Sequence, residues 1–188
     1  MNKLLMPLTV CTWIFCFGIA LAGPSAQAGI LIEPYIGYFA GKSKQATQTT
    51  LNVKGPGYGA RLGYTKLGFM IGLDYQTGSQ TNDASPNHFD LTPTNVGAFV
   101  GYQLPILLRA YAGYNFIAKV KGTNPSNHIA YSGNGVKVGV GFTALPLVSI
   151  NIEYLLTTFD HDDDGNQALT NKINSDMVGL TVSLPLDL

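Results

Sequence analysis

The strict alternation of side-chain character across residues 57–75 constrains the fold of this chain more than any other feature. Two runs of apolar residues at every second position flank a short Lys-Leu-Gly turn: Tyr58, Ala60, Leu62 and Tyr64, then Phe69, Ile71, Leu73 and Tyr75. The opposite positions hold mostly glycine, with one charge in each run, Arg61 and Asp74. Because successive side chains of a strand point to opposite faces, the pattern predicts two half-exposed strands joined by a tight turn. An apolar face with aromatic ends, opposite a narrow polar face, is typical of a wall between lipid and a polar lumen.

The same period of two recurs along the chain and predicts eight strands. They cover about residues 31–40, 57–64, 69–75, 95–102, 107–117, 134–143, 148–155 and 177–184. The links alternate between short turns and long polar segments, and the long links are 41–57, 76–94, 118–133 and 156–176. Transmembrane barrels have long external loops and short periplasmic turns, so both termini are predicted to be periplasmic. The predicted fold is therefore an all-β, eight-stranded, antiparallel up-and-down transmembrane β-barrel.

Residues 1–28 are predicted to form a signal peptide that is cleaved on export, which leaves residues 29–188 as one barrel domain. The segment has a lysine near its start, an apolar run at 8–22 and a small-residue Ala-Gln-Ala cleavage site at 26–28. An N-terminal anchor helix is the alternative, but the Gly-Pro-Ser sequence at 23–25 ends the apolar run early. Both cysteines lie in the signal, so the mature domain is predicted to have neither a disulfide nor thiolate chemistry.

Charge is scarce, and its placement predicts a closed lumen. Charged residues make up 12% of the chain, against roughly 25% in soluble domains, and no outward position of a predicted strand is charged. The six inward charges are predicted to pair with one another: Arg61 with Asp74, Lys137 with Glu153, and Arg109 with Glu33. An eight-stranded barrel has a lumen just wide enough for side chains, and an unpaired charge there is costly. Solvation of these charges by trapped water, without direct pairing, is the alternative.

Aromatic residues gather at both ends of the outward faces. Near the short turns they are Tyr64, Phe69, Tyr102 and Phe142, and near the long links they are Tyr38, Tyr58, Tyr75, Phe116 and Tyr154. Amphipathic rings at two levels are expected where a membrane meets water on each side. The ordinary enrichment of aromatic residues in strands is the alternative, and it does not account for their placement at both ends.

The chain resembles the small eight-stranded outer membrane proteins. The resemblance rests on Glu-Pro-Tyr-Ile-Gly-Tyr at 33–38, Gly-Ala-Arg-Leu-Gly-Tyr at 59–64 and Val-Gly-Leu-Thr-Val-Ser-Leu at 178–184, and it covers the whole mature chain. These proteins include the outer membrane protein X and W types, the transmembrane half of outer membrane protein A, and neisserial surface protein A. The resemblance implies a monomer in a Gram-negative outer membrane, in contact with lipid and lipopolysaccharide, and delivered by periplasmic chaperones and the barrel assembly machinery. The chain departs from these proteins by ending in Leu188 instead of an aromatic residue.

Two non-enzymatic functions are compatible with these features. In the first, the lumen is plugged by the charge network, and the surface loops serve envelope stability or contact ligands and lipopolysaccharide. In the second, the barrel is a small porin-like channel or a channel for a hydrophobic ligand, because the many inward glycines leave volume. Relief of crowding in a strongly curved wall is the alternative explanation of these glycines. Nothing in the sequence suggests a nucleic-acid partner.

A third function, modification of lipid A, receives little support from the sequence. A deacylase on a barrel wall needs a serine near a histidine, with an acid that orients the imidazole. The histidines, His88, His128 and His161, lie in predicted loops, and His128 is four residues from Ser132 without an outward acid nearby. No catalytic residue is therefore predicted, and the chain is expected not to be an enzyme.

Two features of the long links suggest ligands on the external side. Five lysines lie at the expected level of lipopolysaccharide phosphates, with solubilising surface charge as the alternative: Lys42, Lys44, Lys54, Lys119 and Lys121. Carboxylates at alternate positions before a glycine match the first half of a calcium loop. The predicted ligands of this weak calcium site are Asp160, Asp162, Asp164 and Asn166. Its second half departs from the motif because Asn171 stands where a bidentate glutamate is expected, and a solvated acidic loop is the alternative. No other cofactor is predicted.

Overall fold

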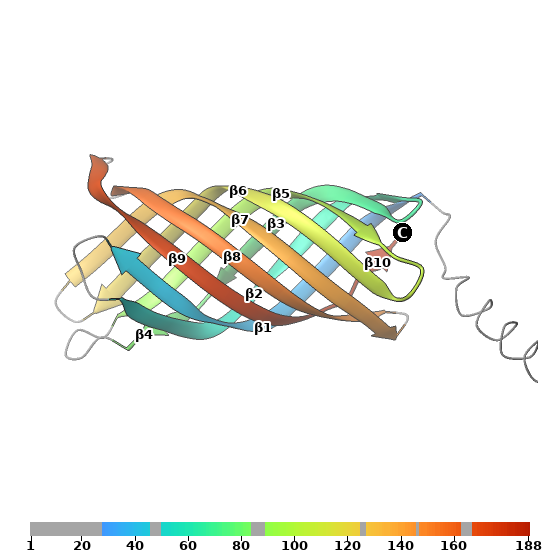
Figure 1. Ribbon diagram of the computed structural model, residues 1–188, viewed down its shortest axis with the longest axis horizontal. Coiled ribbons are helices and arrows are strands. Elements are labelled where there is room, and N and C mark those ends of the chain that lie inside the picture. Colours follow the sequence, from blue (N-terminus) through green and yellow to red (C-terminus); the bar gives the residue numbers. More distant parts are fainter. Residues whose placement is uncertain (1–27, 46–49, 84–88, 125–126, 146, 163–166) are drawn as a thin grey trace, which may run out of the picture.

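The computed structural model describes residues 28–45, 50–83, 89–124, 127–145, 147–162 and 167–188. Its strand segments form one antiparallel sheet that is wrapped into a cylinder (Figure 1). The segments are β1 (Gly29–Gln45), β2 (Leu51–Lys66), β3 (Phe69–Gly78), β4 (Gln80–Asn82), β5 (Asp90–Gln103), β6 (Leu108–Asn124), β7 (Asn127–Leu145), β8 (Val148–Asp162), β9 (Gln167–Ser183) and β10 (Leu186–Asp187). Among these residues, no helix is long and apolar enough to cross a membrane.

The sheet closes into a ring of eight strand positions. β4 continues the path of β3 beyond Ser79, because both segments lie between β2 and β5. The two-residue β10 likewise continues β9 along the same edge of β1. β1 closes the ring, since it pairs with β2 on one side and with β9 on the other. The predicted eight-stranded, antiparallel up-and-down barrel is therefore confirmed.

The chain begins and ends its described path at the end of the barrel that carries the short turns (Figure 1). The backbone N–H of Ile30 donates to the carbonyl of Leu188 at 2.9 Å, and the N–H of Leu188 donates back at 3.0 Å. At the same end, Leu67 and Gly68 join β2 to β3 with φ angles of 53° and 82°. Positive φ at both central residues characterises the tight type I′ hairpin, whose twist matches that of the flanking strands.

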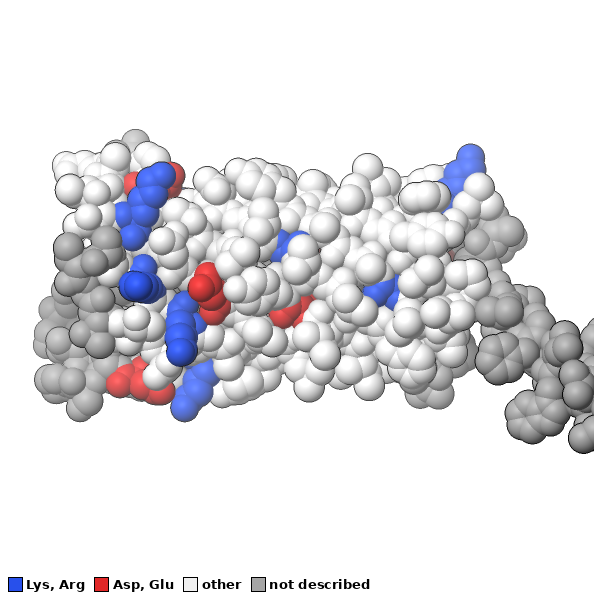
Figure 2. Space-filling model, in the orientation of Figure 1, with Lys and Arg blue, Asp and Glu red and all other residues white. Residues whose placement is uncertain are grey.

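Large apolar side chains cover the middle of the outer wall, where Ile36 is 68% exposed and Leu73 is 57% exposed. The aromatic residues predicted for the two girdles are all exposed on this wall: Tyr38, Tyr58, Tyr64, Phe69, Tyr75, Tyr102, Phe116, Phe142 and Tyr154. Figure 2 shows that charged side chains on this view gather mainly toward the end with the long links. The outer wall therefore has the apolar belt that a membrane-spanning barrel needs.

All eight strand positions run further toward the long links than the sequence predicts, so these links are largely strand and not loop. The period of two continues there, but the outer face becomes polar and several inward positions become apolar. On β1, the exposed positions change from Ile36 and Tyr38 to Lys42 and Lys44. On β2, the position before the exposed Lys54 holds a buried valine.

This change of the outer face explains why the sequence analysis ended each strand too early. Apolar outward residues mark a strand only where lipid lies outside the wall. Backbone N–H and C=O groups need partners beside lipid and beside water alike, so the ladder continues after the outer face has become polar. The strand extensions thus combine a polar outer face with an inner face that carries many apolar side chains.

Replacing Leu73 by arginine tests the apolar belt. Because a cation would then face lipid near the middle of the bilayer, we expect Leu73→Arg to lower the free energy of unfolding by about 2–4 kcal/mol. Asn52→Arg, at an exposed position on the extension of β2, should change it by less than about 0.5 kcal/mol. Equilibrium urea unfolding of the barrel in lipid vesicles measures both. Equal effects of the two substitutions would contradict a lipid-facing belt.

Candidate functional site

Two apolar clusters and a charge layer are the main layers of buried side chains inside the barrel. The lower cluster is apolar and consists of Leu31, Met70, Phe99 and Tyr111. The charge layer holds the six predicted inward charges. The upper cluster is again apolar and consists of Phe39, Val53, Leu155 and Met177, with Leu91 packed against it. β1 alone crosses all three layers, because Leu31, Glu33 and Phe39 are buried inward positions of one strand.

The register of the sheet positions the charge layer. Glu33, Arg61 and Asp74 lie directly opposite one another on β1, β2 and β3, so they form a row across one wall. The other three charges come from β6, β7 and β8. All six are buried, and Asp74 is the most exposed of them at 4%. Such burial requires that each charge finds a partner inside the lumen.

Arg61 is the centre of the charge layer. Its Nη1 donates to Glu33 Oε1 at 3.0 Å, and its Nη2 donates to Glu153 Oε1 from across the lumen. Its Nε lies 3.6 Å from Asp74 Oδ2, which is an ion pair without a hydrogen bond. One guanidinium group therefore meets three carboxylates that come from three other strands.

Lys137 and Arg109 complete the pairing. Lys137 Nζ donates to Asp74 Oδ2 at 2.7 Å and lies 3.7 Å from Glu153 Oε2. Arg109 Nη2 donates to Glu33 Oε1. Each pair proposed from the sequence is thus an ion pair in the structure, but for Arg61 and Lys137 the short hydrogen bonds go to other carboxylates. The hydrogen bonds differ from the predicted pairs because these long side chains also reach across the lumen. The order of the strands along the sequence does not show such contacts.

Two tyrosines that the sequence analysis did not include hold the charge layer in place. The guanidinium carbon of Arg61 lies 4.6 Å from the ring centre of Tyr35 and 4.4 Å from that of Tyr111, which are cation–π distances. The Tyr35 hydroxyl donates to Asp74 at 2.8 Å, and the Tyr111 hydroxyl donates to Glu153 at 2.7 Å. Both tyrosines therefore contact a cation with the ring and an anion with the hydroxyl.

Inward glycines provide the space for these rings. A Cβ added at Gly139 would lie 2.3 Å from the Tyr111 ring, and one at Gly59 would lie 2.6 Å from the Tyr35 ring. Real Cβ atoms do not approach other atoms so closely, so any larger residue would displace the tyrosines. Much of the volume that inward glycines leave is thus filled by aromatic side chains. A sequence could reveal this contact between a tyrosine ring and a glycine where a large inward residue on one strand lies beside an inward glycine on the next strand.

A neutral polar group surrounds Arg109 nearer the short-turn end. Its Nε and Nη2 donate to Asn151 Oδ1 at 2.9 and 2.7 Å, and its Nη2 also donates to Ser183 Oγ at 3.0 Å. Asn151 in turn donates to Thr181 at 3.2 Å and to Ser183 at 3.0 Å. These residues stand at inward positions of β8 and β9, but nothing in their spacing distinguishes them from other polar lumen residues.

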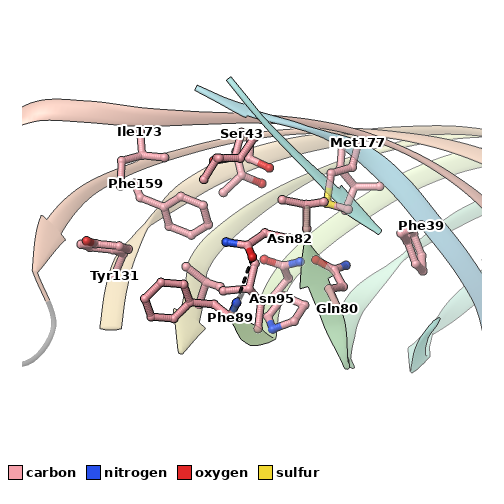
Figure 3. A pocket seen from close by; sticks show the side chains of 18 of the residues that line it. Phe39, Ser43, Gln80, Asn82, Phe89, Asn95, Tyr131, Phe159, Ile173 and Met177 are labelled. Carbon is pink, nitrogen blue, oxygen red and sulfur yellow. Dashed lines mark hydrogen bonds between the residues drawn. The ribbon is translucent and has the colours of Figure 1, made fainter. Parts of the chain in front are cut away.

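A cavity of about 300 Å³ lies in the lumen beyond the upper cluster, toward the long links (Figure 3). Every position of the strand ring contributes to its wall. Most of the lining is apolar and includes Phe39, Leu51, Val120, Ile129, Phe159 and Ile173. Its polar lining consists of uncharged groups, mainly amides such as Gln80, Asn82 and Asn95 (Figure 3). Most of the lining lies in segments that were expected to be loops, and for this reason the cavity was not predicted from the sequence.

The five lysines proposed to contact lipopolysaccharide lie on strand extensions and not in loops. Lys42 and Lys44 are on β1, Lys54 is on β2, and Lys119 and Lys121 are on β6. All except Lys119, which is half-buried, are exposed. Lys54 Nζ lies 3.7 Å from Asp83 Oδ1 in a surface ion pair. The lysines therefore stand on the outer wall beyond the apolar belt.

The proposed calcium ligands are only partly within the described residues. Asp160 and Asp162 lie in β8, because pairing with β7 and β9 continues to the end of that strand, so they are not in the predicted loop. Asp164 and Asn166 lie outside the described residues. Among the described residues, no group of three or more acidic, histidine or cysteine side chains could hold a metal ion.

The structure corrects the expected absence of an outward acid beside a histidine and a serine. Ser132 on β7 lies opposite His161 on β8, and His161 Nδ1 is 2.8 Å from Asp160 Oδ1. All three border a shallow surface pocket. A hydrogen bond from serine to histidine, which a catalytic triad needs, is not among those of the described residues. His128 lies in β7, and His88 is outside the described residues.

A double-mutant cycle tests the pairing of Arg61 with Glu153. We expect Arg61→Met alone to cost about 3–5 kcal/mol of unfolding free energy, because it leaves buried carboxylates uncompensated. Combining it with Glu153→Gln should cost less than the sum of the two single changes. The exposed pair of Lys54 and Asp83 is the control, with a coupling of at most about 1 kcal/mol. Urea unfolding in lipid vesicles gives these values, and additive effects at Arg61 and Glu153 would refute the pair.

Comparison with known proteins identifies the family. The family model described as outer membrane protein beta-barrel domain matches residues 14–184. Neisserial surface protein A shares 17% identity over 85% of this chain and 99% of that chain, with a TM-score of 0.57. The attachment invasion locus protein of Yersinia pestis, solved with the heparin analogue sucrose octasulfate, shares 16% identity over 83% and 99%, with a TM-score of 0.55. No curated protein matches the chain. These identities show the fold alone, whereas the family match over most of the sequence shows that the chain belongs to the outer membrane protein beta-barrel domain family.

Proposed function

We propose that this chain is a non-conducting, non-enzymatic barrel of the outer membrane, whose lumen is plugged by the charge layer and whose external half contacts lipopolysaccharide. The observation that carries the proposal is the set of contacts around Arg61. Its side chain touches Glu33, Asp74, Tyr111 and Glu153. These partners come from β1, β3, β6 and β8, so one buried group bridges the lumen from wall to wall.

The contacts of the inward glycines also favour a plug over a channel. A channel requires a continuous path of water or ligand past the charge layer. The rings of Tyr35 and Tyr111 occupy the space beside Gly59 and Gly139 at this level. Phe39 extends the obstruction upward, because it is fully buried and its ring packs between Gly57 and Gly179.

A catalytic role for the wall receives less support. His161 has its acid partner, but no hydrogen bond among the described residues links it to Ser132. The serine would therefore lack the general base that activates a nucleophile. We retain the non-enzymatic assignment for this reason.

The remaining parts of the proposal concern export and the outer surface. We propose that residues 1–28 are removed as a signal peptide and that both termini of the monomeric barrel lie in the periplasm. Periplasmic chaperones and the assembly machinery would then dock the final strand, whose β10 segment pairs with β1. The lysine-bearing extensions would contact lipopolysaccharide phosphates. A barrel of the same fold, from Yersinia pestis, was solved with the polyanion sucrose octasulfate.

Liposome swelling tests the plug. We expect liposomes that contain the folded mature barrel to swell in arabinose no faster than protein-free liposomes, because the charge layer leaves no path for the sugar. A porin of about 16 strands serves as the positive control, since such barrels leave an aqueous channel. Swelling that rises with the ratio of protein to lipid would overturn the non-conducting assignment.

A lysine series tests the contact with lipopolysaccharide. We expect replacement of the five external lysines by glutamine to weaken retention of lipopolysaccharide by the purified barrel, most clearly at low salt, because surface attraction is screened by ions. Lys66→Gln is the matched control, since this exposed lysine ends β2 at the short-turn end. Equal retention by the native protein and the five-lysine variant, measured by gel analysis of co-purified lipid, would show that these charges only solubilise the surface.

A further inference from the structure

The strand extensions enclose an apolar space that neither the membrane span nor the charge layer requires. Outside the wall, the extension of β2 carries the exposed side chains of Asn52 and Lys54. On the inside, Leu51 and Val53 of the same strand line the cavity, and Phe159 of β8 lines it as well. The backbone hydrogen bonds between the strands do not require these inward side chains to be apolar, because polar side chains here could be solvated by water. Apolar side chains around an enclosed space are instead the usual lining of a small-molecule site.

We propose that this cavity binds a small, neutral, largely apolar molecule that carries one hydroxyl group. Its volume of about 300 Å³ is about twice that of an engineered apolar cavity that takes up benzene. A molecule with two fused aromatic rings, or a branched hydrocarbon of similar bulk, therefore has enough room. The lining contains no charged side chain, and a buried charge without a partner is strongly unfavourable, so the ligand is uncharged.

Gln76 defines the polar group of the ligand. This cavity-lining side chain is 5% exposed, and its Oε1 atom has no hydrogen-bond partner among the described residues. Its neighbour across the β3–β5 ladder, Asn95, also lines the cavity and is buried. Buried polar groups in proteins are normally hydrogen-bonded, and a ligand hydroxyl would supply the missing donor. Because a hydroxyl both donates and accepts, it satisfies the amide in either orientation.

The upper cluster forms the floor of the cavity. Phe39 is fully buried and Leu155 is 4% exposed, and both also line the cavity. The ligand therefore enters and leaves at the long-link end, and the site is a dead end above the charge layer. The inference goes beyond the proposed plug and does not depend on it, since binding and swelling are measured separately and either can fail alone.

Equilibrium dialysis of 2-naphthol against the mature barrel in lipid nanodiscs tests the site, with the probe quantified by its absorbance. We expect saturable binding of one molecule per barrel, above partition into empty nanodiscs. Leu155→Trp fills the cavity and should weaken binding at least tenfold. Leu156→Trp, on the next residue but 39% exposed on the outer wall, should leave binding unchanged.

A comparison of probes tests the hydroxyl. We expect native protein to bind 2-naphthol about five- to tenfold more tightly than naphthalene, which is the effect of one net hydrogen bond. Gln76→Leu should remove this preference while naphthalene still binds, and Gln103→Leu, outside the cavity, should keep it. The absence of saturable binding by both probes, or equal binding by Leu155→Trp and native protein, would overturn the site. Equal affinity of native protein for the two probes would overturn the role of Gln76.

Discussion

Complete pairing of strand edges is the constraint on which the rest of this structure depends. Inside lipid, an unpaired backbone N–H or C=O group has no water to bond with, so a spanning sheet must close on itself. β1 achieves the closure by pairing with β2 and β9, and β10 extends the second of these ladders past Pro185 to Leu31. Closing a sheet of eight strand positions brings all inward side chains to a common axis. The charge layer is a consequence, because charges that avoid the lipid face must meet one another there.

The lumen tolerates these charges because each has hydrogen-bond or ion-pair partners and because the large side chains around them pack against glycines. Arg61 bonds or pairs with three carboxylates through one planar group, which suits a guanidinium because its charge is delocalised and its donors point in several directions. Tyr35 and Tyr111 then stack on Arg61 and bond to two of these carboxylates. Both rings lie over glycines of neighbouring strands. Charge pairing, cation–π contact and packing thus depend on one arrangement, and a change in any of them affects the other two.

Local alternation was enough to predict the fold and the face of each lumen charge, because both depend only on a period of two. It did not reveal contacts across the axis. Arg61 and Glu153 are 92 positions apart, and alternation shows which face a residue occupies but not its height or its partner on the opposite wall. Asp160 shows a second limit, in which a local motif predicted a loop where the structure has a strand. Its spacing matches half of a calcium loop, yet Asp160 lies at a bulge of β8, and the pairing of this strand resumes beyond it as far as Asp162. No side-chain motif in the sequence shows how far the pairing of a strand continues.

The change of the outer face from apolar to polar along the strands accounts for the positions of both the charge layer and the cavity. β1 continues beyond Tyr38 to Gln45, which extends the strand by about 23 Å. Where lipid lies outside, the lumen holds the charge layer together with the lower apolar cluster, and where the outer face is polar, apolar side chains form most of the inner lining. The upper cluster marks the change, with Phe39 and Leu155 lying between the charges and the cavity. These apolar side chains keep water from the charge layer on that side, and lower local polarity strengthens each ion pair. The same residues therefore form the floor of the cavity and cover the charge layer on the side of the long links.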